Sequence, residues 1–155
     1  MCCVHTLFLG SDNMYMLKVE ASFDSAHFLS GYDGKCRNIH GHRWKVEAVI
    51  KSSALIENGQ QRGMVTDFSI LKRNLKEAAD NFDHALIYER GSLKENTLAC
   101  LKDENFRLIE VEFRPTAENL AKYFYSIMKS NGYGVDSVTV YETPNNCAIY
   151  MEDKA

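Results

Sequence analysis

The sequence predicts an α+β domain in which an antiparallel sheet carries helices on one face. Apolar and polar residues alternate at residues 16–23, 42–51, 138–142 and 147–151, a period that is typical of half-buried strands. Between these segments, two stretches repeat apolar residues at three- and four-residue steps, which is typical of amphipathic helices. Because the strands are grouped rather than alternating with helices, an antiparallel sheet is favoured over a parallel one.

The first two predicted strands each place their apolar side chains on one face. These side chains are Leu17, Val19, Ala21 and Phe23 in the first strand, and Trp44, Val46, Ala48 and Ile50 in the second. The segment between them, residues 30–38, is polar and contains two glycines, which indicates a loop. If the two strands pair as a hairpin, their ends beside this loop lie together.

Two helices follow from their capping residues. Asp67 predicts the start of a helix that runs to about residue 81, and Thr116 predicts the N-cap of a second helix that ends at Asn131-Gly132. Residues 88–105 are polar and irregular, so we expect a long irregular segment there. Residues 106–114 alternate over a short distance and favour a short strand.

Composition limits the classes of function. The chain has 155 residues and a net charge of −3, so it forms one domain without the broad basic surface that nucleic acid requires. No apolar stretch is long enough to span a bilayer. The five cysteines have no disulfide-framework spacing, which favours a reduced, cytoplasmic protein. We expect residues 1–15 to be a flexible N-terminal extension and residues 16–155 to form the domain.

Three histidines on compatible strand faces predict a metal site. His40 and His42 are two residues apart, so in a strand they point to one face with Cα atoms about 6.6 Å apart. His27 shares the parity of the first strand's apolar residues, and a hairpin would place it near the same end. A metal ion held by three imidazoles, with its fourth coordination position open, is typical of a catalytic zinc site. The alternatives are hydrogen-bonded histidines or a non-catalytic zinc-binding module.

Cys36 lies four residues before His40 in the glycine-containing loop. A thiol in such a loop beside a cation would ionise readily and could act as a base or a nucleophile. The alternative is an ordinary small residue in a loop.

Three more side chains have both a chemical and an ordinary interpretation. Asp83-His84 offers a second acid–base group, or is a surface turn after the first helix. Glu142 lies on one strand face with Val138 and Val140. Glu142 is either a solvent-exposed residue at the strand end or the side chain that binds a ligand rich in N–H groups.

Six motifs occur in a specific order. They are Phe23 to His27, Cys36 with His40-Gly41-His42, Gly63 to Phe68, Phe82-Asp83-His84, Pro115 to Leu120, and Glu142-Thr143-Pro144. In this order they resemble the 6-pyruvoyl tetrahydropterin synthase superfamily over about residues 16–151. The three-residue gap between Cys36 and His40 resembles the bacterial 6-carboxytetrahydropterin synthases of the queuosine pathway. The pyruvoyl-forming synthases of animals typically have a longer gap.

The resemblance implies the tunnelling fold (T-fold), a four-stranded antiparallel sheet with two helices on one face. It also implies a homohexamer, built as a dimer of trimers, with active sites between subunits. The metal would be Zn²⁺, held by His27, His40 and His42.

The implied reaction converts 7,8-dihydroneopterin triphosphate to 6-carboxy-5,6,7,8-tetrahydropterin, with release of acetaldehyde and triphosphate. Cys36 would remove a side-chain proton, and His84, oriented by Asp83, would handle the other proton. Glu142 would bind the pterin N–H groups, assisted by Thr143. The enzymatic alternative is 6-pyruvoyl tetrahydropterin synthesis from the same substrate.

Overall fold

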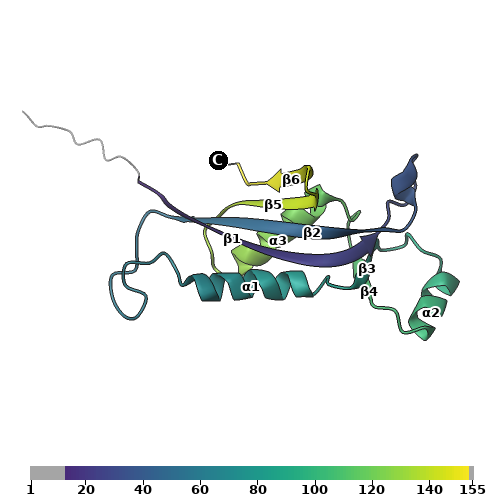
Figure 1. Ribbon diagram of the computed structural model, residues 1–155, viewed down its shortest axis with the longest axis horizontal. Coiled ribbons are helices and arrows are strands. Elements are labelled where there is room, and N and C mark those ends of the chain that lie inside the picture. Colours follow the sequence, from purple (N-terminus) through teal and green to yellow (C-terminus); the bar gives the residue numbers. More distant parts are fainter. Residues whose placement is uncertain (1–12, 154–155) are drawn as a thin grey trace, which may run out of the picture.

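A computed structural model describes residues 13–153, which form one curled sheet with helices packed against one face (Figure 1). The strand order is β4-β3-β1-β2-β5-β6. The strands are β1 (Tyr15–His27), β2 (His40–Ser52), β3 (Ala85–Glu89), β4 (Leu108–Val111), β5 (Val135–Thr143) and β6 (Asn146–Tyr150). Most of the predicted N-terminal extension lies outside the described residues, and Tyr15 already belongs to β1.

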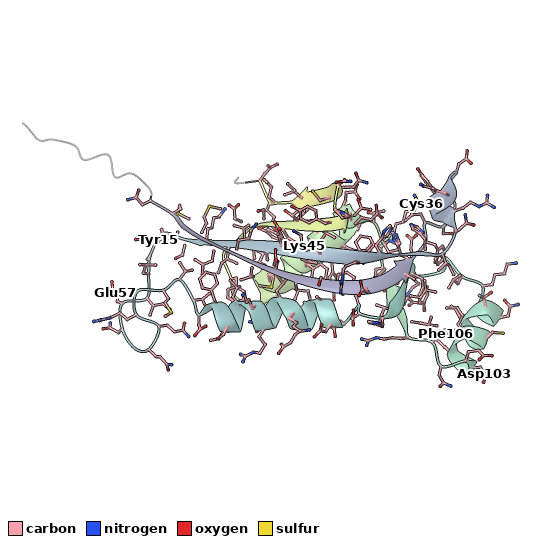
Figure 2. The ribbon with its side chains drawn as sticks, in the orientation of Figure 1. Tyr15, Cys36, Lys45, Glu57, Asp103 and Phe106 are labelled. Atoms are coloured by element: carbon pink, nitrogen blue, oxygen red, sulfur yellow. The ribbon has the colours of Figure 1, made fainter. Side chains whose placement is uncertain are left out.

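The predicted hairpin of the first two strands is confirmed. β1 and β2 pair antiparallel from Tyr15↔Ser52 to His27↔His40 without a register shift. The connecting loop contains a short 3₁₀ turn, Lys35–Arg37. Figure 2 shows Cys36 in this loop, at the end of the hairpin opposite to Tyr15. The hairpin register therefore places two of the predicted metal ligands directly beside each other.

The prediction of a four-stranded antiparallel sheet is wrong, because the sheet has six strands and is mixed. β1, β2, β5 and β6 form the antiparallel part. β3 pairs parallel with the end of β1, and β4 pairs parallel with β3. The direction follows from α1 (Phe68–Asp80), which runs along β1 toward the loop end of the hairpin, so that β3 continues in the direction of β1 (Figure 1).

Both predicted helices are confirmed, and a third was not predicted. The Asp67 side chain caps α1 by accepting a hydrogen bond from the Ser69 amide, and Thr116 caps α3 (Ala117–Ser130) in the same way. These two helices cover one face of the sheet (Figure 1). Helix α2 (Glu95–Asp103) buries no residue. Sequence patterns reveal a helix through the apolar stripe that it packs against the core, and α2 packs no such stripe.

The core continues directly into the cluster of histidines. Phe23 and Trp44 stack with ring centroids 6.1 Å apart, and both are almost completely buried. The Trp44 ring lies edge-on to His27 at 4.9 Å and to His42 at 5.3 Å. An apolar wall therefore restricts how these imidazoles can rotate.

In the described part of the chain, none of the helices has the length and apolar character needed to span a bilayer.

Candidate metal centre

The three predicted histidines converge on one point at the end of the hairpin. Their ring centroids are separated by 4.4 Å (His27 and His40), 5.2 Å (His27 and His42) and 5.0 Å (His40 and His42). One nitrogen from each ring and one Glu142 oxygen all lie within 4.8 Å of one another. These four side chains could hold a metal ion.

Backbone carbonyls orient two of the imidazoles. The Nδ1 atom of His27 lies 2.7 Å from the Pro115 carbonyl oxygen, and that of His40 lies 2.8 Å from the Asn38 carbonyl oxygen. A carbonyl oxygen only accepts hydrogen bonds, so Nδ1 carries the proton in both rings. The Nε2 lone pairs are then free to bind a metal, with carbonyls as the outer partners that metal-binding histidines ordinarily have.

Buried nitrogens without partners support metal binding. The Nε2 atoms of His27 and His42 are buried and form no hydrogen bond, although buried polar groups are nearly always paired. The Oε1 atom of Glu142 lies 3.4 Å from the first and 3.6 Å from the second. Donor atoms of a tetrahedral zinc with bonds of about 2.1 Å are roughly 3.4 Å apart. The three histidine nitrogens and the Glu142 oxygen lie close enough to one another to fit such an ion, with Glu142 either as a fourth ligand or beside the open position.

The environment favours the neutral forms of His27 and His42, which are the forms that bind a metal. Burial lowers the pKa of His27 to about 4, although the hydrogen bond to the Pro115 carbonyl acts in the opposite direction and raises it. His40 and His42 lower it further. Burial also lowers the pKa of His42, although the Glu142 carboxylate raises it. Neutral rings at pH 7 bind a cation without first losing a proton.

Glu142 reaches the centre because of strand pairing. β2 pairs with β5 as far as Lys45↔Tyr141, so the next residue, Glu142, points to the face that carries His42. From the sequence we expected Glu142 to bind a ligand, but not to approach the histidines. Only the register between β2 and β5 could have revealed this contact.

Cys36 and Glu142 line one pocket of about 270 Å³. Thr116 and Glu118, at the start of α3, form another part of its wall, and Cys147 lies in the same wall. Glu118 was not predicted from the sequence as a site residue, and its presence gives this pocket a second carboxylate besides Glu142.

Asp83 and His84 form a hydrogen-bonded pair outside this pocket. The Nδ1 atom of His84 donates to Oδ2 of Asp83 at 2.7 Å, and the His84 side chain is 80% exposed. His84 has a φ of 52°, a left-handed conformation that is uncommon for a residue with a side chain. It lines a different, largely apolar hollow of about 440 Å³ with Ala26 and Leu108. One chain therefore does not bring His84 and Cys36 into one pocket.

Thr143 lies beside Glu142, as the sequence requires, in a further hollow that also includes His42 and Arg43. Its Oγ1 atom accepts a hydrogen bond from the Asn145 amide at 3.4 Å. The side chain thus stabilises the turn between β5 and β6 at the edge of the centre.

We expect Asp83 to make stability depend on pH. The Asp24 amide, which donates to Asp83 at 2.8 Å, and the adjacent His84 lower the pKa of the Asp83 carboxyl. A lowered pKa stabilises the fold above the unfolded value of about 3.9, and this contribution is lost as pH falls through the folded value. Asp83→Asn should therefore be less stable than the metal-free parent protein at pH 6, and urea titrations should show this difference shrinking toward pH 3. A difference that stays constant over that range would contradict the assignment.

The fold and the site define a class: an α+β protein with three histidines and a glutamate that could hold a metal ion at the end of a strand hairpin. The sequence profile of the 6-pyruvoyl tetrahydropterin synthase family matches residues 16–153. The chain belongs to this family.

Relatives in sequence extend over most of the chain. The 6-carboxy-5,6,7,8-tetrahydropterin synthase of Haemophilus influenzae is 38% identical over 142 residues, which are 90% of this chain and 100% of that protein. The enzyme of the same name from Rickettsia bellii is 33% identical, covering 79% of this chain and 90% of the relative. That from Synechocystis is 30% identical, covering 91% and 96%.

Solved structures have the same fold. An uncharacterized protein from Wolinella succinogenes superposes with a TM-score of 0.77 at 24% identity, covering 91% of this chain and 99% of that one. The 6-pyruvoyl tetrahydropterin synthase of Caenorhabditis elegans gives a TM-score of 0.63 at 26% identity, covering 91% and 97%.

Proposed function

We propose that the protein converts 7,8-dihydroneopterin triphosphate and one water molecule to 6-carboxy-5,6,7,8-tetrahydropterin, with release of acetaldehyde and triphosphate. The observation that carries the proposal is the convergence of three imidazoles, two of them with unpartnered buried Nε2 atoms, beside the end of the thiol-bearing loop. The names of the relatives that are 30% to 38% identical support the carboxylated product. We further propose that this product enters queuosine biosynthesis in the cytoplasm.

The metal would be Zn²⁺, held by His27, His40 and His42. Three neutral imidazoles and one open position suit zinc in a catalytic role. When bound, zinc would polarise the oxygens of the substrate side chain and stabilise developing negative charge. Glu142 then has two possible partners, the ion and the substrate, and we place it on the substrate, because a three-histidine site with an open position needs no fourth protein ligand.

The pocket that contains Cys36 would hold the reacting carbon atoms. Cys36, as a thiolate, would remove a proton from the substrate side chain. Glu142 would accept hydrogen bonds from the pterin ring N–H and amino groups, for which a carboxylate offers two oxygens. Thr143 would keep the strand end that carries Glu142 in place.

Asp83 and His84 would act in the site of a neighbouring subunit. His84 is exposed and lines a different hollow from Cys36 of the same chain, and an exposed, oriented imidazole suits proton transfer to a ligand held by another copy. This arrangement requires the homohexamer, a dimer of trimers, that the family resemblance implies. Edge-to-edge assembly of the sheets would also pair strand edges that otherwise stay open.

Product analysis tests the proposal directly. The purified protein, incubated with dihydroneopterin triphosphate and Zn²⁺, should release acetaldehyde and a carboxylated pterin that mass spectrometry identifies. A product that keeps all three side-chain carbons would instead indicate 6-pyruvoyl tetrahydropterin synthesis. Zinc binding without turnover of this substrate would leave the non-catalytic module as the interpretation.

A further inference from the structure

Arg114 connects the segment that orients His27 with the loop that carries Cys36. It precedes Pro115, whose carbonyl oxygen accepts the hydrogen bond from Nδ1 of His27 at 2.7 Å. The Arg114 carbonyl itself accepts hydrogen bonds from the Thr116 amide at 2.7 Å and from Nδ2 of Asn119 at 3.0 Å. The first turn of α3 therefore fixes the main chain of Arg114, next to the carbonyl that orients His27.

The Arg114 side chain extends in the other direction, to the loop between β1 and β2. Its Nη2 atom donates to the Ser30 carbonyl oxygen at 2.8 Å, and its guanidinium carbon lies 5.7 Å from the centre of the Tyr32 ring. This distance is within the range of a cation–π contact. Its Nε atom is buried and has no hydrogen-bond partner in the described chain. The guanidinium is thus held between a carbonyl and an aromatic ring.

The loop that Arg114 contacts is the one that carries Cys36. The Leu29 amide donates to the Cys36 carbonyl at 2.9 Å, and the Tyr32 amide donates to the Leu29 carbonyl at 3.2 Å. Tyr32 and Cys36 line the same pocket. Among the hydrogen bonds of residues 13–153, the bond from Arg114 is the one that reaches residues 28–39 from outside the β1–β2 hairpin.

We infer that Arg114 is a positioning residue that sets the place of the Cys36 thiol relative to the metal centre. One end of this residue is fixed to the segment that orients His27, and the other end is fixed to the thiol loop. The two halves of the site then move as one body. Since misplacement of a reacting group by about 1 Å can cost roughly a hundredfold in rate, such a connection has a direct chemical use.

Two variants test this inference, and its kinetic part rests on the proposed function. Arg114→Ala should keep one zinc per chain, because the carbonyl of residue 115 belongs to the main chain. The rate of Cys36 alkylation by iodoacetamide, followed on the Cys36 peptide by mass spectrometry, should rise about fivefold or more as the loop loosens. In the kinetics, kcat should fall about tenfold with a smaller change in KM.

Arg114→Lys serves as the conservative variant, because lysine can donate to the Ser30 carbonyl but cannot stack as a planar group. It should recover part of the lost kcat and slow the alkylation again. Arg73→Ala, which removes an exposed arginine from α1, should match the parent protein in both measurements.

Two results would overturn the inference. One is an Arg114→Ala protein with unchanged Cys36 alkylation. The other is loss of zinc from this variant, which would show that Arg114 supports the metal ligands rather than the loop. If the parent protein has no activity on the pterin triphosphate, the proposed function fails, while zinc content and alkylation still decide the role of Arg114.

Discussion

Replacing His40 by alanine is expected to remove the metal ion and, with it, the enzymatic activity. The substitution deletes one of three imidazoles whose ring centroids lie within 5.2 Å of one another. Outer partners of metal ligands alone are worth about 10- to 100-fold in affinity, so loss of a direct ligand should exceed about a hundredfold. After dialysis, elemental analysis should find much less than one zinc per chain.

His40 is a better test than His27 because its ring is only partly buried. His27 is almost fully buried against Trp44, and its removal would leave a cavity that destabilises the core. His84→Ala is the matched control, because this exposed imidazole lies outside the centre, and the variant should retain its zinc. Added zinc should raise the melting temperature of the His84 variant and the parent protein but not of the His40 variant. Full zinc content in His40→Ala would show that the ligand set is wrong.

The convergence of the three histidines could be predicted from the sequence because it depends on strand parity and one hairpin. Side chains two residues apart on a strand share a face, and the pairing His27↔His40 follows when two adjacent strands form a hairpin. Both conditions are local. The helix caps at Asp67 and Thr116 were predictable for the same reason, since each depends on side chains within three residues.

The missed elements depend on contacts that are distant in sequence. β3 is a five-residue, mostly apolar strand, and periodicity cannot distinguish such a short run from other buried segments. Its pairing with β1 joins residues about 60 positions apart, as in Ser25↔Ala85. The approach of Glu142 to the histidines likewise depends on the β2–β5 register. No short motif encodes these pairings.

Replacing Cys36 by serine is expected to remove most of the turnover while leaving the metal and the fold in place. The side chain lies in a 3₁₀ turn that buries no residue, so the smaller hydroxyl creates no core cavity. It is not one of the side chains that converge on the metal point, so zinc content should stay at one per chain. A hydroxyl is a far weaker acid than a thiol, so the alkoxide base is essentially absent at pH 7. Because acid–base catalysis contributes about 10²–10⁴-fold, kcat should fall by a factor in that range.

Cys147→Ser provides the matched control, because Cys147 lines the same pocket from β6 and is also a free thiol. This variant should keep most of its turnover, since the proposed chemistry depends on the position of Cys36 beside the centre rather than on any thiol in the pocket wall. Steady-state kinetics with dihydroneopterin triphosphate, combined with zinc analysis and thermal unfolding of both variants, separates the cases. A Cys36→Ser enzyme that retains its turnover would remove Cys36 from the mechanism. An equal loss of turnover in Cys147→Ser would show that the pocket, rather than one base within it, is sensitive to substitution.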